Sequence, residues 1–282
     1  MVIEKNRKSF SYMRIFIYFF LILGSFMMMV PFIWLIRSSL MTNAQIFVFP
    51  PEWIPNPFQW SNYSEALTIV PFYRYFLNTM KIEVFTVIGV LLTSSLAAFS
   101  FARLKWPGKN IVFALLLSTL MLPYAVTLIP TFIFWKSIGM INTIVPLTVP
   151  AWLGGGAFNI FLLRQFFLTI PRELDEAAYM DGATPFTVYW KIILPLSKPA
   201  LIVVGIFTFI NVWNDFLGPL VYLGDNDSYT LALALASFKG MMNAQWGYLM
   251  AASAAITFPI VVLFFLAQKS FIQGITLTGL KG

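Results

Sequence analysis

The chain has 282 residues, of which 59% are hydrophobic and 10% are charged, and it carries a formal net charge of +7 and a mean hydropathy of +0.81. Soluble domains carry about 25% charged residues, so this chain cannot cover a globule with polar surface, and we expect lipid to be its solvent. Cysteine and histidine are both absent, which excludes disulfides, thiol chemistry, imidazole bases and most zinc sites.

Long uncharged runs predict membrane-spanning helices, because about 20 apolar residues cross the hydrocarbon layer of a bilayer. The runs are residues 15–36; 84–102, extended outward to about Phe76; 110–135; 137–163; 199–214, continuing to Gly224; and 240–268. Prolines within the runs predict kinks, since neighbouring groups in a membrane helix can satisfy the freed carbonyls. The predicted fold class is therefore an all-α integral membrane protein with six transmembrane helices.

The distribution of positive charge predicts the orientation of these spans. Most of the 18 lysine and arginine residues fall on one side of the six-span map, and the positive-inside rule assigns that side to the cytoplasm. Both termini are then cytoplasmic. The first run follows a basic stretch but is too long for a secretory signal and lacks a small-residue cleavage site, so we expect it to be retained as a span. The same asymmetry explains the net charge without a nucleic-acid partner.

The longest external segment of this map is residues 37–75, which is rich in proline and aromatic residues. Four prolines between residues 50 and 57 rule out a regular helix there. Trp53 and Trp60 suit the headgroup level of a membrane. We expect an interfacial loop with a short helix.

Motifs of enzyme chemistry and nucleotide binding are absent from the sequence. No G-x-x-x-x-G-K-[ST] occurs, so we do not expect the chain to bind ATP through a P-loop. Gly154, Gly155 and Gly156 lie inside the fourth run without the spacing of a dinucleotide fingerprint. Three adjacent glycines destabilise a helix, so they predict a break, a hinge or a close helix contact, or else part of a translocation path. An integral-membrane enzyme would need a catalytic constellation that the sequence lacks.

A polar segment interrupts the apolar pattern at residues 171–198 and contains "EAAYMDGATPFTVYWKIILP". Pro171 and three acidic residues predict the first turn of a helix. Gly182 can end that helix in the left-handed conformation. Thr184 then caps a second helix that begins with Pro185. The prediction is two short helices joined at a glycine on the cytoplasmic side.

The two predicted helices each carry an apolar face. Ala177 and Ala178 give the first a face of small residues. The second has an aromatic and aliphatic face, consisting of Phe186, Tyr189, Trp190 and Ile193. A short loop has no core of its own, so these faces need a partner. The alternative is a helix that lies on the bilayer surface.

This segment resembles the coupling motif of binding-protein-dependent ABC importer permeases, which reads E-A-A, three residues, G, nine residues, I, one residue, L-P. The spacing agrees throughout, and the matching residues are Glu176, Ala177, Ala178, Gly182, Ile192, Leu194 and Pro195. The stretches "LLRQFFLTIPREL", "WNDFLGPLVYL" and "QGITLTGLKG" are similar to the carbohydrate-importer branch, and most like the small permease of the maltose transporter. The resemblance covers nearly the whole chain.

The resemblance implies a single transmembrane domain over residues 1–282, with a permease core at 76–270, in a bacterial cell membrane. It implies a heterodimer with a second permease, two cytoplasmic ATPase subunits and an external sugar-binding protein. ATP and magnesium would be held by the ATPase subunits, and no cofactor by this chain. The segment at 176–195 would dock in a groove of one ATPase, with residues 273–282 as a secondary contact, so that ATP-driven closure produces alternating access.

Polar residues in the fifth run predict the substrate path. Asn211, Trp213, Asn214 and Asp215 lie together there, and polar groups within spans usually face a cavity. Amides, carboxylates and aromatic rings are groups that bind sugars. The alternatives are hydrogen bonding between helices and contact with the binding protein, and in a similar transporter the other permease can hold most of the sugar site.

Two other classes of transporter remain open at this stage. A secondary transporter or channel would rely on Asp215 as its coupling carboxylate, and would leave the docking motif unexplained. The other is an ABC importer permease for a non-sugar polar solute. The sequence does not identify a particular sugar.

Overall fold

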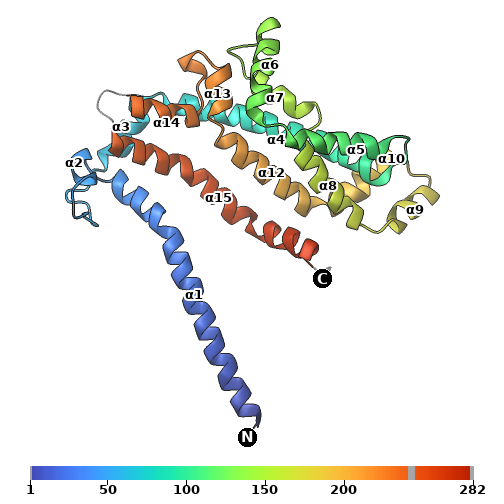
Figure 1. Ribbon diagram of the computed structural model, residues 1–282, viewed down its shortest axis with the longest axis horizontal. Helices are drawn as coiled ribbons and strands as arrows, with labels where there is room; N and C mark the ends of the chain where they lie inside the picture. Colours follow the sequence, from blue (N-terminus) through green and yellow to red (C-terminus); the bar gives the residue numbers. More distant parts are fainter. Residues whose placement is uncertain (1, 241–244, 280–282) are drawn as a thin grey trace. The chain divides into compact units, whose positions relative to one another are not determined.

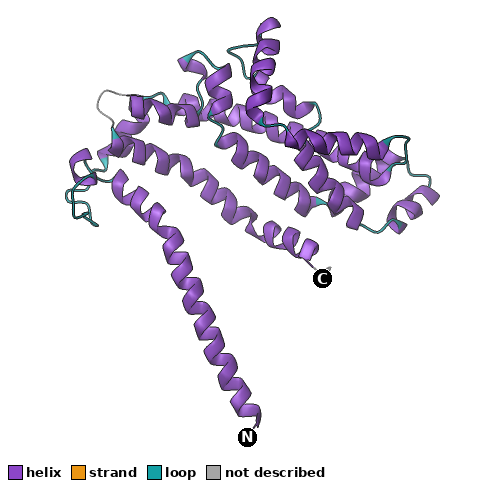
Figure 2. Cartoon of the chain, in the orientation of Figure 1, coloured by secondary structure: helices purple, strands orange, loops and turns teal. Residues whose placement is uncertain are grey.

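The computed structural model describes residues 2–240 and 245–279, which form helices joined by loops and turns, with no strand among them (Figure 2). The chain divides into two compact units. The first comprises Met1–Val70 and Ser237–Thr257, and the second comprises Pro71–Ala236 and Phe258–Gly282. Figure 1 labels the helices of both units.

Several helices are long and apolar enough to cross a membrane. Among the described residues there are 4 such helices, or up to 6 spans if each of two bent helix pairs counts as one. The single helices are Tyr12–Ser39, Phe72–Arg103, Val145–Thr169 and Trp246–Gln268, and the pairs are Lys109–Met121 with Tyr124–Ser137 and Pro185–Leu196 with Lys198–Trp213. The chain is an all-helical protein with four to six candidate spans.

The first unit contains α1 (Val2–Ser39), α2 (Asn43–Ile46), α3 (Ser61–Ile69) and the beginning of α15 (Trp246–Gly279). The Asn62 side chain joins the end of α1 to α3, because its amide donates to the carbonyls of Ser39 and Met41 at 3.0 and 2.9 Å. The segment at 37–75 thus holds two short helices where the sequence predicted one. Its external location stays a prediction.

The second unit is built on α4 (Phe72–Arg103). This helix packs against α7 (Val145–Trp152), α8 (Ala157–Thr169) and α12 (Lys198–Trp213). The unit also contains α5 (Lys109–Ser118), α6 (Tyr124–Ser137), α9 (Glu173–Met180), α10 (Pro185–Val188), α11 (Leu194–Leu196), α13 (Leu217–Tyr222), the first part of α14 (Leu231–Gly240) and the later part of α15. Its apolar core includes Phe99, Leu163, Phe167, Val188 and Val204.

The third predicted run, residues 110–135, is not a continuous helix. Its two parts are bent by 100° at the break between Met121 and Tyr124. Leu122 is extended, with ψ 116°, because the ring of Pro123 disfavours the helical conformation for the residue before it. The fifth run is likewise interrupted, since α12 ends at Trp213 and α13 begins at Leu217.

The three adjacent glycines separate α7 from α8. Their φ angles of 135°, 68° and 88° at Gly154, Gly155 and Gly156 are positive, and L-residues with a side chain rarely adopt such values. A Cβ at Gly155 would lie 2.8 Å from the Ser94 Cβ and from the Val90 carbonyl oxygen. Gly155 therefore supplies both the break and a close contact with α4, and a role in translocation stays a prediction.

This contact predicts the cost of a methyl group at the glycine break. Gly155→Ala should destabilise the protein by about 1–3 kcal/mol, since overpacking and backbone strain act together, measured as thermal unfolding in detergent. The matched control is Gly205→Ala on α12, whose Cβ would meet only Leu91 at 3.8 Å. Equal unfolding temperatures for the two variants would contradict the close contact.

Candidate functional site

The segment predicted to be two helices joined at a glycine has that local structure. α9 ends at Met180, Asp181 is its C-cap, and Gly182 follows with φ 80°. The Thr184 hydroxyl accepts a hydrogen bond from the Thr187 backbone N–H at 3.2 Å, and Pro185 is the first residue of α10. Figure 1 shows α9 and α10 at the end of the second unit farthest from α13 and α14.

The second helix of the segment continues beyond α10 with a change of winding. Residues Tyr189–Ile193 form a π-helical turn that leads into α11, and the helix ending at Leu196 meets α12 at a bend of 77°. Pro195 lacks the N–H that an α-helix would use at that position, so the preceding turn widens. The Ser197 N–H closes the end by donating to the carbonyls of Ile193 and Leu194 at 3.0 and 3.1 Å.

A buried arginine holds the first helix of the segment to the core. The Arg103 side chain is 2% exposed, and its Nη1 lies 3.3 Å from Oδ2 of Asp175 in α9. Its Nη2 donates to the carbonyls of Phe167 and Ile170 at 2.8 and 2.7 Å. Arg103, the last residue of α4, thus binds both the C-terminal end of α8 and the first turn of α9.

Because the ion pair is buried, it fixes the position of α9 but adds little net stability. Burial raises the pKa of the Asp175 carboxyl, and the positive charge of Arg103 opposes that shift. Oδ1 of Asp175 and Nε of Arg103 have no hydrogen-bond partner among the described residues. A buried pair gains little over apolar packing, but removing one partner leaves an uncompensated charge.

The second helix is anchored by side chains of its own. The Tyr189 hydroxyl is 2.8 Å from the Ser95 hydroxyl of α4, and its ring centroid lies 5.3 Å from that of Phe99. Val188 and Ile193 are fully buried in the same core. The face that the sequence assigned to a partner is therefore partly used within the chain.

The rest of that face is exposed. Phe186 and Trp190 are 66% and 56% exposed, and their rings stack with centroids 6.4 Å apart. Met180, at the end of α9, is 88% exposed. Of the motif residues, those exposed are Glu176, Ala177, Gly182 and Pro195, and those half-buried are Ala178, Ile192 and Leu194. The segment thus presents exposed apolar side chains, while Val188, Tyr189 and Ile193 hold it in the core.

The structure does not bring the four predicted path residues into one cluster. Trp213 is 1% exposed and stacks on Phe209 with centroids 5.2 Å apart, and a role on the path stays a prediction for it. Asn211 and Asn214 are exposed. The Asp215 Oδ1 accepts a hydrogen bond from the Gly218 N–H at 3.0 Å and thereby shapes the turn that precedes α13.

Residues 86–277 match the protein family described as "Binding-protein-dependent transport system inner membrane component". The chain belongs to this family. It is a transport permease by family, not an enzyme, and among the described residues no group of three or more histidine, cysteine, aspartate or glutamate residues could hold a metal ion.

Relatives of this permease are similar over most of their length. The arabinooligosaccharides transport system permease protein AraQ of Halalkalibacterium halodurans is 34% identical over 246 residues, which cover 87% of this chain and 86% of AraQ. The sn-glycerol-3-phosphate transport system permease protein UgpE of Yersinia pestis is 32% identical over 279 residues, 96% of this chain and 98% of UgpE. A crystal structure of a bacterial ABC transporter involved in the import of the polysaccharide alginate matches in fold with TM-score 0.79, at 23% identity, over 91% of this chain and 96% of that chain.

Two buried charged residues of the permease were not singled out from the sequence. Arg103 was counted only as a cytoplasmic charge. Glu83 lies in the outward extension of the second run, directly before its uncharged part; it is 2% exposed, and neither carboxylate oxygen has a hydrogen-bond partner among the described residues. The signal available for both was an ionisable residue at or within the apolar stretch of α4, where such groups are rare and often functional.

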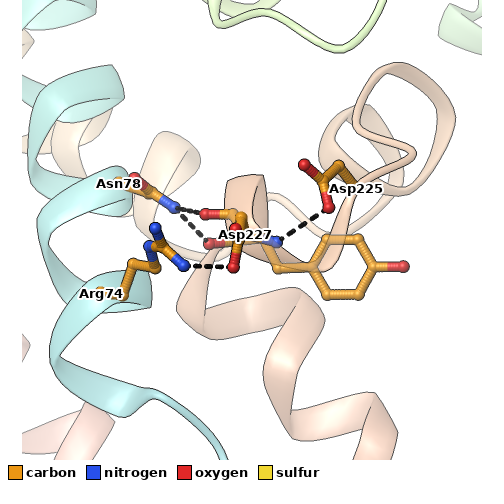
Figure 3. Close-up of polar contacts among 5 residues, drawn as sticks. Arg74, Asn78, Asp225 and Asp227 are labelled. Atoms are coloured by element: carbon orange, nitrogen blue, oxygen red, sulfur yellow. Dashed lines mark hydrogen bonds and ion pairs between the residues drawn. The ribbon is translucent and has the colours of Figure 1, made fainter.

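An exposed ion pair offers a contrast with the Arg103 site. Arg74 on α4 pairs with Asp227, and the side chains of these residues are 55% and 61% exposed. Asn78 donates to the backbone carbonyls of Asp227 and Tyr229 at 2.8 and 3.2 Å, and Asp225 caps the same turn (Figure 3). Exposed pairs of this kind contribute about 0–1 kcal/mol.

Loss of the guanidinium group should lower the free energy of unfolding by very different amounts at the two ion pairs. Arg103→Gln should destabilise the permease by about 3–5 kcal/mol, since Asp175 is left buried without its partner, and should open α9 to proteolysis. Arg74→Gln should cost about 1 kcal/mol or less. Thermal unfolding of both variants measures the difference. An Arg103→Gln variant as stable as Arg74→Gln would contradict the role of Arg103 in holding α9 to the core.

Proposed function

We propose that this permease is a subunit of an ATP-driven importer that moves a sugar or oligosaccharide into the cytoplasm by alternating access. The proposed assembly contains a second permease, two ATPase subunits that hold ATP and magnesium, and an external binding protein. Family membership and the sugar substrates named for the AraQ relative and the alginate transporter support this assignment.

The coupling role is supported by exposed apolar side chains that lie beside buried residues of the same helix. Phe186, Trp190 and Met180 are exposed, while Val188 and Tyr189 between them are buried. The buried residues hold the backbone that carries Phe186 and Trp190, which suits docking into a groove of an ATPase subunit because little backbone freedom is lost on binding. Glu176, Ala177 and Gly182, with Ile192, Leu194 and Pro195, would shape this contact.

The same contacts suggest how motion of an ATPase would reach the spans. A displacement of α10 acts on α4 through the Tyr189–Ser95 contact and on α12 through the helix that ends at Leu196. Nucleotide and substrate then shift the balance between inward-open and outward-open states only as far as they bind the two states with different affinity.

The substrate class is the less constrained part of the proposal. The name of the UgpE relative refers to sn-glycerol 3-phosphate, so a non-sugar polar solute is the alternative. The exposed amides of Asn211 and Asn214 remain our candidates for the path, with Asp215 and Gly154–Gly156 beside them in the proposal. For Trp213 the buried stacking favours a packing role.

Orientation is proposed from charge alone. With the basic residues inside, both termini and the segment at 171–198 face the cytoplasm, and residues 37–75 face outward. A reporter fused after Lys105 should then respond as cytoplasmic, and one fused after Gln59 as external. The opposite result would move the docking surface to the wrong side of the membrane.

The glycine between the two helices provides a direct test of coupling. Gly182→Val should leave the amount of assembled complex in the membrane unchanged but reduce uptake by about tenfold or more, because a β-branched residue is strained at φ 80°. A Cβ at Gly182 would meet nothing within 4 Å, so crowding does not explain the loss.

The matched control is Gly182→Asn, because asparagine tolerates the left-handed conformation better than valine. It should restore much of the uptake in membrane vesicles loaded with the external binding protein. If valine and asparagine are equally active, the local geometry at Gly182 does not serve coupling.

The exposed amides of α12 give a test of the substrate path. Asn211→Ala or Asn214→Ala should slow uptake by up to about tenfold, because a hydrogen bond is worth roughly 0.5–1.5 kcal/mol, and the effect should depend on which sugar is offered. ATPase activity stimulated by the loaded binding protein should fall less. Equal losses for every sugar with reduced assembly would assign the amides to helix packing.

A further inference from the structure

A basic pocket lies at the turn between α4 and α5. It is an open hollow of about 470 Å³ and is lined by Lys105, Trp106, Gly108, Lys109, Asn110 and Ile111. The turn joins two membrane segments, since one candidate span ends at Arg103 and the next bent pair begins at Lys109. The pocket is therefore at the boundary between the membrane and water.

Positive charge is concentrated at this pocket. Lys105 and Lys109 both line it, and Arg164 and Arg172 add positive charge that acts on the Lys109 ammonium group. In the described part of the chain the ion pairs involve Arg74 and Arg103, and none includes these four residues. Mutual repulsion of this kind is relieved by an anion, and the most effective anion is one with several acceptor oxygens, such as a phosphate.

The positions of two of these cations are fixed by the protein. The Lys109 Nζ donates to the Leu104 carbonyl at 2.9 Å, which keeps it beside the turn. The Arg164 guanidinium lies 4.3 Å above the Phe113 ring. Lysine and arginine side chains held in this way lose less conformational freedom on binding a ligand than mobile ones.

An apolar surface leads away from the pocket along α5. Ile111, Val112 and Leu115 are 68%, 45% and 62% exposed, and α5 carries no charged residue after Lys109. A free phosphate ion would use only the cations. A phospholipid would use both features, with its phosphate at the lysines and its acyl chains against α5.

We propose that this pocket binds the headgroup of an anionic phospholipid. The phosphate lies between Lys105 and Lys109, and Arg164 and Arg172 add long-range attraction. The proposal does not depend on the transported substrate or on coupling to an ATPase, so it can fail or hold independently of the proposed function.

The test is lipid binding by the full chain in detergent, measured by native mass spectrometry. Phosphatidylglycerol should remain bound where phosphatidylcholine does not. The Lys105→Gln/Lys109→Gln variant should bind phosphatidylglycerol roughly fivefold more weakly for each charge removed, and the Lys105→Arg/Lys109→Arg variant should bind it nearly as well as the unmodified chain. Because Lys105 is exposed, Lys105→Gln alone tests the site if the double variant misfolds.

The matched control is Lys81→Gln/Lys136→Gln, which removes the same charge at two exposed lysines outside the pocket. It should not change lipid binding. An equal loss in this control would mean general charge attraction, and displacement of the lipid by inorganic phosphate would mean an anion site without lipid. Either result, or unchanged binding in the Lys105→Gln/Lys109→Gln variant, would overturn the proposal.

Discussion

The second unit depends on the guanidinium group of Arg103 more than on any other single polar group. It meets the carboxylate of Asp175 and the carbonyls of Phe167 and Ile170 at the place where α4, α8 and α9 come together. The planar group directs its donors along fixed directions, so one side chain sets the positions of three segments. The chain leaves α8 and starts the helix–glycine–helix segment within this contact.

The apolar packing around Arg103 allows it to serve as an anchor. α8 approaches α4 closely because Gly155 has no side chain at its contact with Ser94, and Leu163 and Phe167 fill the interface without exposure to solvent. Close-packed interiors of this kind do not deform continuously. A push on α9 or α10 is therefore expected to move α4 and α8 together rather than to bend the joint between them.

The local structure of the helix–glycine–helix segment could be predicted from the sequence. Its tertiary contacts could not. Gly182, Thr184 and Pro185 act through their own backbone conformation, and each holds the predicted position. The pairing of Arg103 with Asp175 joins residues far apart in the sequence that both resembled solvated charges. The same holds for Trp213, because its polar neighbours in the sequence gave no sign that its ring stacks on Phe209; its place on the path stays a prediction.

The aromatic face of the second helix is divided, so the segment can be held in the core and still offer a surface for the proposed docking. An amphipathic helix usually has one buried face, and Phe186, Tyr189, Trp190 and Ile193 resembled such a face. Tyr189 and Ile193 point into the core, while Phe186 and Trp190 stack outside it. The π-helical turn at Tyr189–Ile193 adds a residue to that turn and so rotates the side chains that follow it. Both outer rings lie beside Tyr189, with centroids 6.2 and 6.4 Å from its ring. A partner bound to the outer rings would therefore act on the core through Tyr189.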